Sequence, residues 1–166
     1  GKYIESDNPA KDFNVGIIRV SDLSEKPLSI ENCVLASNFS YGCLFRTDPF
    51  KRLIFNNTSF VDNSFHEFRL GSSWGIGQTY LANCLFSGNS GSFINTFVEE
   101  SDFIRNKYLE FGAWEGGTSF TTCRLLYNNY VSIGGGSISH VRIFNSTISG
   151  NNLLHINCVM NSGLFM

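Results

Sequence analysis

The chain has no excess of basic residues, no long apolar run and no metal-binding cysteine pair. Its net charge is −2, so no basic stripe exists to neutralise phosphates, and we expect no nucleic-acid partner. No apolar run approaches the roughly 20 residues of a membrane span, and no segment has the pattern of a signal peptide. There is no Cys-x-x-Cys pair and the three histidines are scattered. We therefore expect neither a metal nor another cofactor.

The sequence also lacks the marks of a helical repeat, since Ala, Glu and Lys do not recur with a 3.6-residue period. What recurs is a hydrophobic residue followed three positions later by asparagine. These motif asparagines are Asn38, Asn63, Asn89, Asn106, Asn128 and Asn151, with successive spacings of 25, 26, 17, 22 and 23 residues. Each repeat can bury its apolar face only by stacking on its neighbours.

Residues at the same distance from each motif asparagine are alike in polarity. Eight residues before lie Ile30, Phe55, Leu81, Val98, Phe120 and Ile143; three before lie Leu35, Phe60, Phe86, Phe103, Leu125 and Ile148; five after lie Cys43, Phe68, Ile94, Phe111, Ile133 and Ile156. Apolar and mixed positions alternate, as in half-buried strands. The sequence therefore predicts an all-β fold, a parallel β-helix of about six to seven coils, in which the asparagines can bond between coils and tolerate left-handed backbone.

Residues 28–38 (LSIENCVLASN) and 81–89 (LANCLFSGN) resemble coils of the right-handed parallel β-helix proteins, the pectin-lyase-like superfamily. The resemblance covers roughly residues 15–160 and implies a right-handed winding. The Phe-x-x-Asn form is also similar to the repeats of chlamydial polymorphic autotransporter passengers. The partner Gly-Gly-Ala-Ile repeat of those passengers has one near counterpart here, residues 134–138 (GGGSI).

At 166 residues the chain has the length of one domain. We expect residues 1–14 to form a lead-in or cap and 15–166 to form the β-helix. The apolar residues 163–166 favour a β-helix that continues beyond them, or a last coil that folds back or meets a partner.

The cysteines occupy packing positions. Cys33, Cys84 and Cys123 lie five residues before a motif asparagine, where the other repeats place Thr58, Ser101 and Ser146. We expect all of them to be reduced residues that fill small spaces in the core.

Candidate binding residues lie on variable loops that should leave the coil at one edge, because insertions in solenoids gather on one face. Two glycine-rich loops two coils apart carry the only tryptophans, and the charged loop at 46–52 lies on the same edge. Aromatic rings beside charged groups suit sugars, so we predict a glycan-binding groove; the alternative is that each tryptophan covers the core. The predicted groove comprises Trp74, Trp114, Arg46, Asp48, Lys51, Arg52 and Glu115.

An enzyme on this fold would need clustered carboxylates. No motif position carries an acid in successive repeats. One neighbouring pair, Asp102 and Arg124, is predicted to form an exposed salt bridge between coils. Glu67 and Glu110 are expected to be separated by Phe93.

We therefore expect a secreted or cell-surface β-helix, adhesin-like, that acts as a binding or structural module contacting a polysaccharide or host glycan. Two alternatives stay open. One is a polysaccharide lyase or glycoside hydrolase, or a fragment of one, with its site on the loop face. The other is a stalk that trimerises through outward apolar residues such as Phe97 and Phe144.

Overall fold

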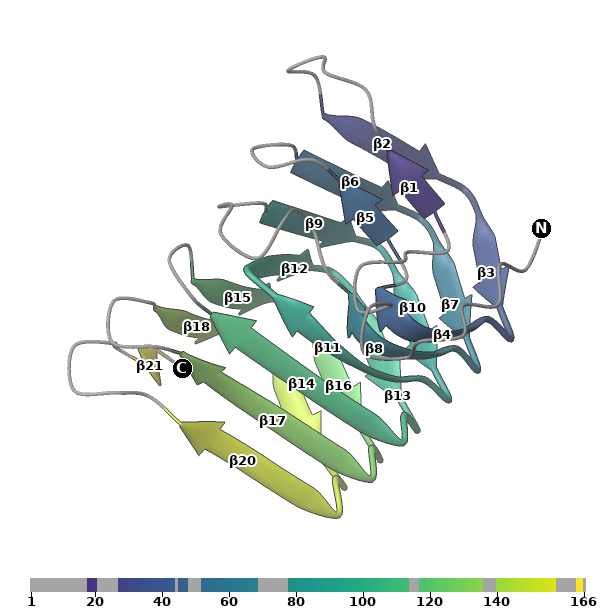
Figure 1. Ribbon diagram of the computed structural model, residues 1–166. Helices are drawn as coiled ribbons and strands as arrows, with labels where there is room; N and C mark the ends of the chain where they lie inside the picture. The colour runs from purple at the N-terminus through teal and green to yellow at the C-terminus, as the bar shows by residue number, and fades with distance from the viewer. Residues whose placement is uncertain are drawn as a thin grey trace.

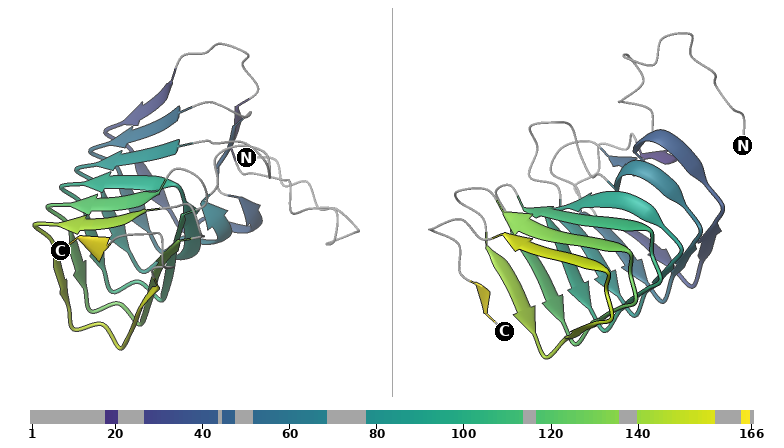
Figure 2. Two further views of the ribbon diagram at one scale, coloured as in Figure 1. Left: turned by 90° about the vertical axis from the view of Figure 1, so that its left-hand side faces the viewer. Right: turned by 90° about the horizontal axis from the view of Figure 1, so that it is seen from below.

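The computed structural model confirms the all-β parallel solenoid. It describes residues 18–20, 27–43, 45–47, 52–68, 78–113, 117–135, 140–157 and 164–165. Every strand pairing in these residues is parallel. The chain winds through three sheets in turn, and neighbours within a sheet come from successive coils (Figure 1). The coils stack along one axis from purple to yellow (Figure 2).

The three sheets are named in the order in which each coil passes through them. The first sheet has seven strands: β2 (Leu28–Glu31), β6 (Arg52–Asn56), β9 (Gln78–Ala82), β12 (Thr96–Glu99), β15 (Thr118–Thr121), β18 (Val141–Phe144) and β21 (Leu164–Phe165). The second has six: β3 (Val34–Ala36), β7 (Ser59–Val61), β10 (Leu85–Ser87), β13 (Asp102–Ile104), β16 (Arg124–Leu126) and β19 (Thr147–Ser149). The third has six: β4 (Phe39–Cys43), β8 (Ser64–Phe68), β11 (Ser90–Ile94), β14 (Tyr108–Ala113), β17 (Tyr130–Gly135) and β20 (Leu153–Asn157). A separate pair consists of β1 (Ile18–Val20) and β5 (Phe45–Thr47).

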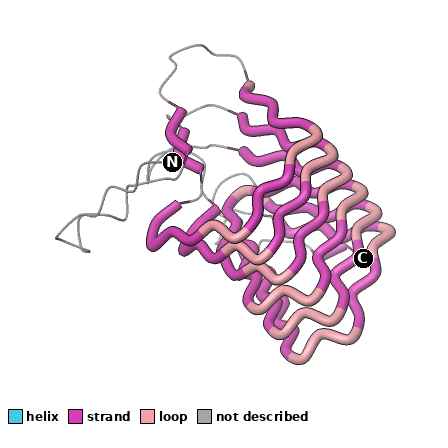
Figure 3. The backbone as a smooth tube through the Cα atoms, turned by 90° about the vertical axis from the view of Figure 1, so that its right-hand side faces the viewer, coloured by secondary structure: helices cyan, strands magenta, loops and turns pink. Residues whose placement is uncertain are grey.

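Two short turns in each coil line up along the stack (Figure 3). The first turn joins the first sheet to the second and ends at the small residue five positions before the motif asparagine. At all six such residues the hydroxyl or thiol donates to the carbonyl oxygen two residues earlier, at 2.7–3.3 Å. The position therefore selects a small side chain that can also donate, a requirement stricter than volume alone.

The second turn joins the second sheet to the third and contains the motif asparagine. The left-handed residue is the one before it, such as Arg105 or Tyr127 (φ 54° and 56°), so the motif asparagines do not use the left-handed backbone that asparagine tolerates. Their bonding between coils is confirmed. Asn106 accepts hydrogen bonds at Oδ1 from the main-chain N–H and Nδ2 of Asn89, and its own Nδ2 donates to Asn128 Oδ1.

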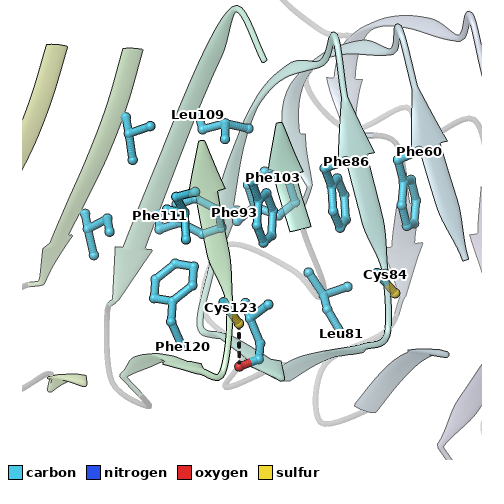
Figure 4. Close-up of a cluster of buried hydrophobic side chains, with 14 of the residues drawn as sticks. Phe60, Leu81, Cys84, Phe86, Phe93, Phe103, Leu109, Phe111, Phe120 and Cys123 are labelled. Carbon is cyan, nitrogen blue, oxygen red and sulfur yellow. Dashed lines mark hydrogen bonds between the residues drawn. The ribbon is translucent and has the colours of Figure 1, made fainter. Parts of the chain in front are cut away.

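The core lies between the three sheets and is built from stacked columns (Figure 4). In the second sheet Phe60, Phe86 and Phe103 are fully buried and in register. Their rings stack with centroids 4.4 and 4.7 Å apart. The columns predicted eight and three residues before each motif asparagine are therefore confirmed as core columns. Parallel in-register pairing brings like side chains into contact at the strand spacing, which favours offset ring stacking.

The column predicted five residues after the asparagine was wrong in two coils, those of Cys43 and Ile94. Cys43 is in register with Glu67 instead of Phe68. Phe93, not Ile94, is buried and pairs with Phe111. The coils that follow have one extra residue after the motif asparagine, for example Lys107, so the offset from asparagine to core changes by one. A one-residue shift exchanges the inward and outward faces of a strand.

Residues 1–14, predicted as a lead-in or cap, lie outside the described residues, as do 158–163 and 166. The right-handed winding stays a prediction from the resemblance.

Candidate functional site: the loop edge and two flanking sheet faces

The variable loops all leave the solenoid at one edge, where each strand of the third sheet leads to the next strand of the first sheet. The connection between β8 and β9 spans residues 69–77, and that between β14 and β15 spans 114–117. Between them, β11 and β12 are joined by Asn95 alone, which is left-handed (φ 49°) and 4% exposed. The two loops that carry the tryptophans therefore flank a coil that has no loop.

Most of the predicted groove falls in parts of the chain that the structure does not describe. Trp74, Trp114, Asp48, Lys51 and Glu115 lie outside the described residues. Their roles stay predictions.

The other two predicted residues are placed in different sheets. Arg46 lies in β5 in register with Arg19 of the separate strand pair. Arg52 is exposed and begins β6 of the first sheet, in register with Gln78 of β9. The structure therefore does not bring Arg46 and Arg52 together in one ladder.

Arg52 lies beside an aromatic pair on the outer face of the first sheet. Its guanidinium carbon is 5.9 Å from the ring centroid of Tyr80, within the range of a cation–π contact. Tyr80 stacks on Phe97 of the next coil, with centroids 5.1 Å apart and planes 15° apart. The Tyr80 hydroxyl donates to Gln78 Oε1 at 2.8 Å. We call Arg52, Ile54, Gln78, Tyr80 and Phe97 the first-sheet patch; Ile54 is in register with Tyr80.

A second aromatic pair lies on the outer face of the third sheet. Tyr108 and Tyr130 stack with centroids 4.8 Å apart and planes 4° apart. The Tyr108 hydroxyl and Ser92 Oγ both donate to Oε2 of Glu110, each at 2.9 Å. Partial burial, and after it the hydrogen bond to and the negative charge of the Glu110 carboxylate, together raise the pKa of Tyr108 to about 12. We call Ser90, Ser92, Tyr108, Glu110 and Tyr130 the third-sheet site.

Small residues surround the third-sheet site. Ser90 is in register with Tyr108 on one side, and Ser64 lies next in the same column. Beyond Glu110 along the strands, Gly112 and Gly134 are paired and half-buried. A Cβ on Gly112 would make ordinary van der Waals contacts, 3.8 Å from the main-chain oxygen of Phe93 and 3.9 Å from Ile94 Cγ1. The stacked tyrosines therefore lie beside short side chains at Ser90 and Ser64, while Ile94 lies next to Gly112 further along the strands.

The predicted salt bridge between Asp102 and Arg124 is confirmed. The residues are in register, and the guanidinium bonds both carboxylate oxygens, with Nε 2.6 Å from Oδ1. This contact raises the pKa of the Arg124 guanidinium. Because both side chains are engaged with each other on an exposed face, the pair has a structural role.

The expected separation of Glu67 and Glu110 by Phe93 was wrong. Ser92 is the residue in register with both. A bulge shifts the pairing of Glu67 in β8, and the extra residue Lys107 shifts that of Glu110 in β14. Within the described residues no group of three metal-ligating side chains comes together.

Cys33, Cys84 and Cys123 are free thiols. Cys84 and Cys123 are buried, and burial raises the pKa of Cys84 to about 11 and also raises that of Cys123. Figure 4 shows Cys123 bonded to a main-chain oxygen within the core. Cys33, in the first described coil of the stack, is exposed.

Sequence reasoning missed both aromatic pairs as sites, although a signal was present. Tyr80 and Phe97 both lie nine residues before a motif asparagine, and Tyr108 and Tyr130 both lie two residues after one. Aromatic residues in one outward slot of successive repeats therefore indicate stacked surface rings.

No helix long and apolar enough to cross a membrane occurs in the part of the chain that the structure describes. The chain matches no protein-family model, and a search of curated proteins finds no significant match.

Proposed function

We propose that this chain is a solenoid binding module, secreted or displayed on a cell surface, that contacts a polysaccharide or surface glycan. The observation that carries the proposal is the first-sheet patch, where Tyr80 and Phe97 stack on the outer face beside an exposed arginine at the loop edge. Sugars present apolar C–H faces and rings of hydroxyls, which aromatic side chains and planar guanidinium or amide groups complement.

The scaffold favours binding because it holds these groups in advance. Leu53, Thr79 and Leu81 flank the outward residues along β6 and β9, point inward and are buried, so the backbone beneath the patch is fixed. A pre-ordered surface loses less conformational entropy on binding than a flexible one. The tryptophan loops on the same edge remain part of the proposal and would extend the contact.

The same surface supports catalysis less well than binding. A lyase or hydrolase would need a pair of free carboxylates. Asp102 is engaged with Arg124. The acids that could complete a catalytic pair at the loop edge, Asp48 and Glu115, lie outside the described residues.

The test is a glycan array together with a depolymerisation assay on one preparation. We expect binding without cleavage, and at least a tenfold loss of affinity in the double variant Tyr80→Ala, Phe97→Ala. Tyr127→Ala is the matched control, because Tyr127 is 63% exposed at the corner between the second and third sheets. Release of cleavage products would overturn the binding-only proposal. Unchanged affinity in the double variant would remove the first-sheet patch from it.

A further inference from the structure

We propose that the third-sheet site binds the ammonium group of an amino sugar, with Glu110 as its anionic partner and Tyr108 as the ring against which the sugar stacks. This inference rests on the proposed glycan-binding function and names a substrate class for a second surface of the same module.

The Glu110 carboxylate is oriented but not neutralised. Its Oε2 accepts hydrogen bonds from Tyr108 and Ser92 at 2.9 Å. Its Oε1 accepts none from the described residues, and no described basic side chain forms an ion pair with it. Two donors on one oxygen fix the plane of the carboxylate and leave the other oxygen available. A donor that also brings a positive charge is the partner that such an oxygen bonds most strongly.

The Tyr108 ring has one covered face and one open face. Tyr130 covers one face of the Tyr108 ring. On the other side the residue in register is Ser90, whose side chain is too short to cover a ring, and Tyr108 is 38% exposed. A pyranose stacked on this face would lie over Ser90, and its substituents would reach Ser92 and the Glu110 carboxylate.

An ammonium fits this arrangement better than a neutral hydroxyl or an acetamide. The raised pKa of Tyr108 keeps its phenol protonated, so the hydroxyl acts as a donor to Glu110 and does not compete as a base. The ammonium would bond Oε1 while its positive charge lies beside the tyrosine rings, a favourable electrostatic position. N-acetylation removes that charge and places a carbonyl against an acceptor, so the same site discriminates against acetylated sugars.

The experiment compares a β-1,4-linked glucosamine tetramer with its fully N-acetylated counterpart by calorimetry at a pH where the amines are protonated. We expect the amino tetramer to bind at least tenfold more tightly. Glu110→Gln keeps the shape but removes the charge, and we expect it to abolish this preference while binding of the acetylated tetramer is unchanged. Glu99→Gln is the matched control for non-specific attraction of a polycation, since Glu99 is exposed on the first sheet.

The variants separate this inference from the proposed function. If acetylated and amino tetramers bind equally, or Glu99→Gln weakens the amino tetramer as much as Glu110→Gln does, the inference is wrong. If neutral glycans still bind and lose affinity in the Tyr80→Ala, Phe97→Ala variant, the proposed function stands without it. If no saccharide on the array or in the calorimeter binds, both are wrong.

Discussion

The asparagine ladder gives the sharpest stability prediction, because two consecutive asparagines differ in their role. Asn128 is fully buried. Its Nδ2 donates to the main-chain oxygen of Phe103 and to Asn151 Oδ1, both at 2.9 Å. Its Oδ1 accepts from the main-chain N–H and Nδ2 of Asn106, also at 2.9 Å. Asn129 is exposed and its side chain accepts one hydrogen bond, from Asn152.

Asn128→Ala removes four hydrogen bonds and leaves two donors of Asn106 without their acceptor in the core. At roughly 1 kcal/mol for each bond, with a range of about 0.5 to 1.5, the loss is about 4 kcal/mol. Asn129→Ala removes one solvent-exposed bond, and its effect should stay within about 0.5 kcal/mol. The difference between the two variants, about 3.5 kcal/mol, is a large part of the stability of a typical domain.

Urea unfolding followed by far-UV circular dichroism measures both changes. With a slope of about 2 kcal/mol per molar urea, Asn128→Ala should lower the midpoint by about 2 M, while Asn129→Ala leaves it nearly in place. If the two midpoints differ by less than about 0.5 M, the buried ladder is not a major source of stability and the argument fails. Unequal slopes would show instead that a variant changes how much structure unfolds in one step.

Three further outcomes follow. Gly91→Ala should destabilise the fold by about 1–3 kcal/mol, since its Cβ would lie 2.0 Å from a buried phenyl ring; Gly112→Ala should not, since its Cβ would meet no atom closer than 3.8 Å, and urea unfolding compares the two. A thiol reagent at neutral pH should modify exposed Cys33 and spare Cys84, whose pKa is raised to about 11, as peptide mapping by mass spectrometry will show. The Tyr108 phenol should titrate near pH 12 in NMR of ¹³C-labelled tyrosine, so stability linked to its proton is retained below pH 10 and lost as pH rises from about 10 to 12.

The core could be predicted from the sequence because each coil repeats the same burial problem. Phe86 and Phe103 stand at the same distance from a motif asparagine, and the structure places them in register with stacked rings. The Asp102–Arg124 pair was predicted for the same reason, since both lie one residue before a core position. Wherever the number of residues between a core position and its motif asparagine is constant, residues at the same distance from successive asparagines pair in register.

Prediction failed where the offset changes. Phe93 lies four residues after its motif asparagine, whereas Phe111, in register with it, lies five residues after Asn106 because that coil has one extra residue. Phe68 is also in register with Phe93, because a bulge shifts the pairing of β8 with β11. Both are local adjustments of main-chain pairing, and no side-chain pattern in the sequence marks them. The left-handed residue of the second turn could not be predicted for a different reason. Arg105 and Tyr127 adopt positive φ although such residues seldom do, because the hydrogen bonds of the following asparagine fix the turn.

The candidate sites were harder to predict because outward residues meet no burial requirement. Tyr108 and Tyr130 stack only because their inward neighbours Leu109 and Val131 are buried in register. The core thus decides which surface residues lie one strand spacing apart, while leaving their chemistry unconstrained. An outward substitution does not disturb the column behind it, so a solenoid can acquire binding groups one residue at a time. For this reason each candidate site consists of a few outward residues that occupy the same repeat position in neighbouring coils. The asparagine motif, although it occurs six times, carries no information about the ligand.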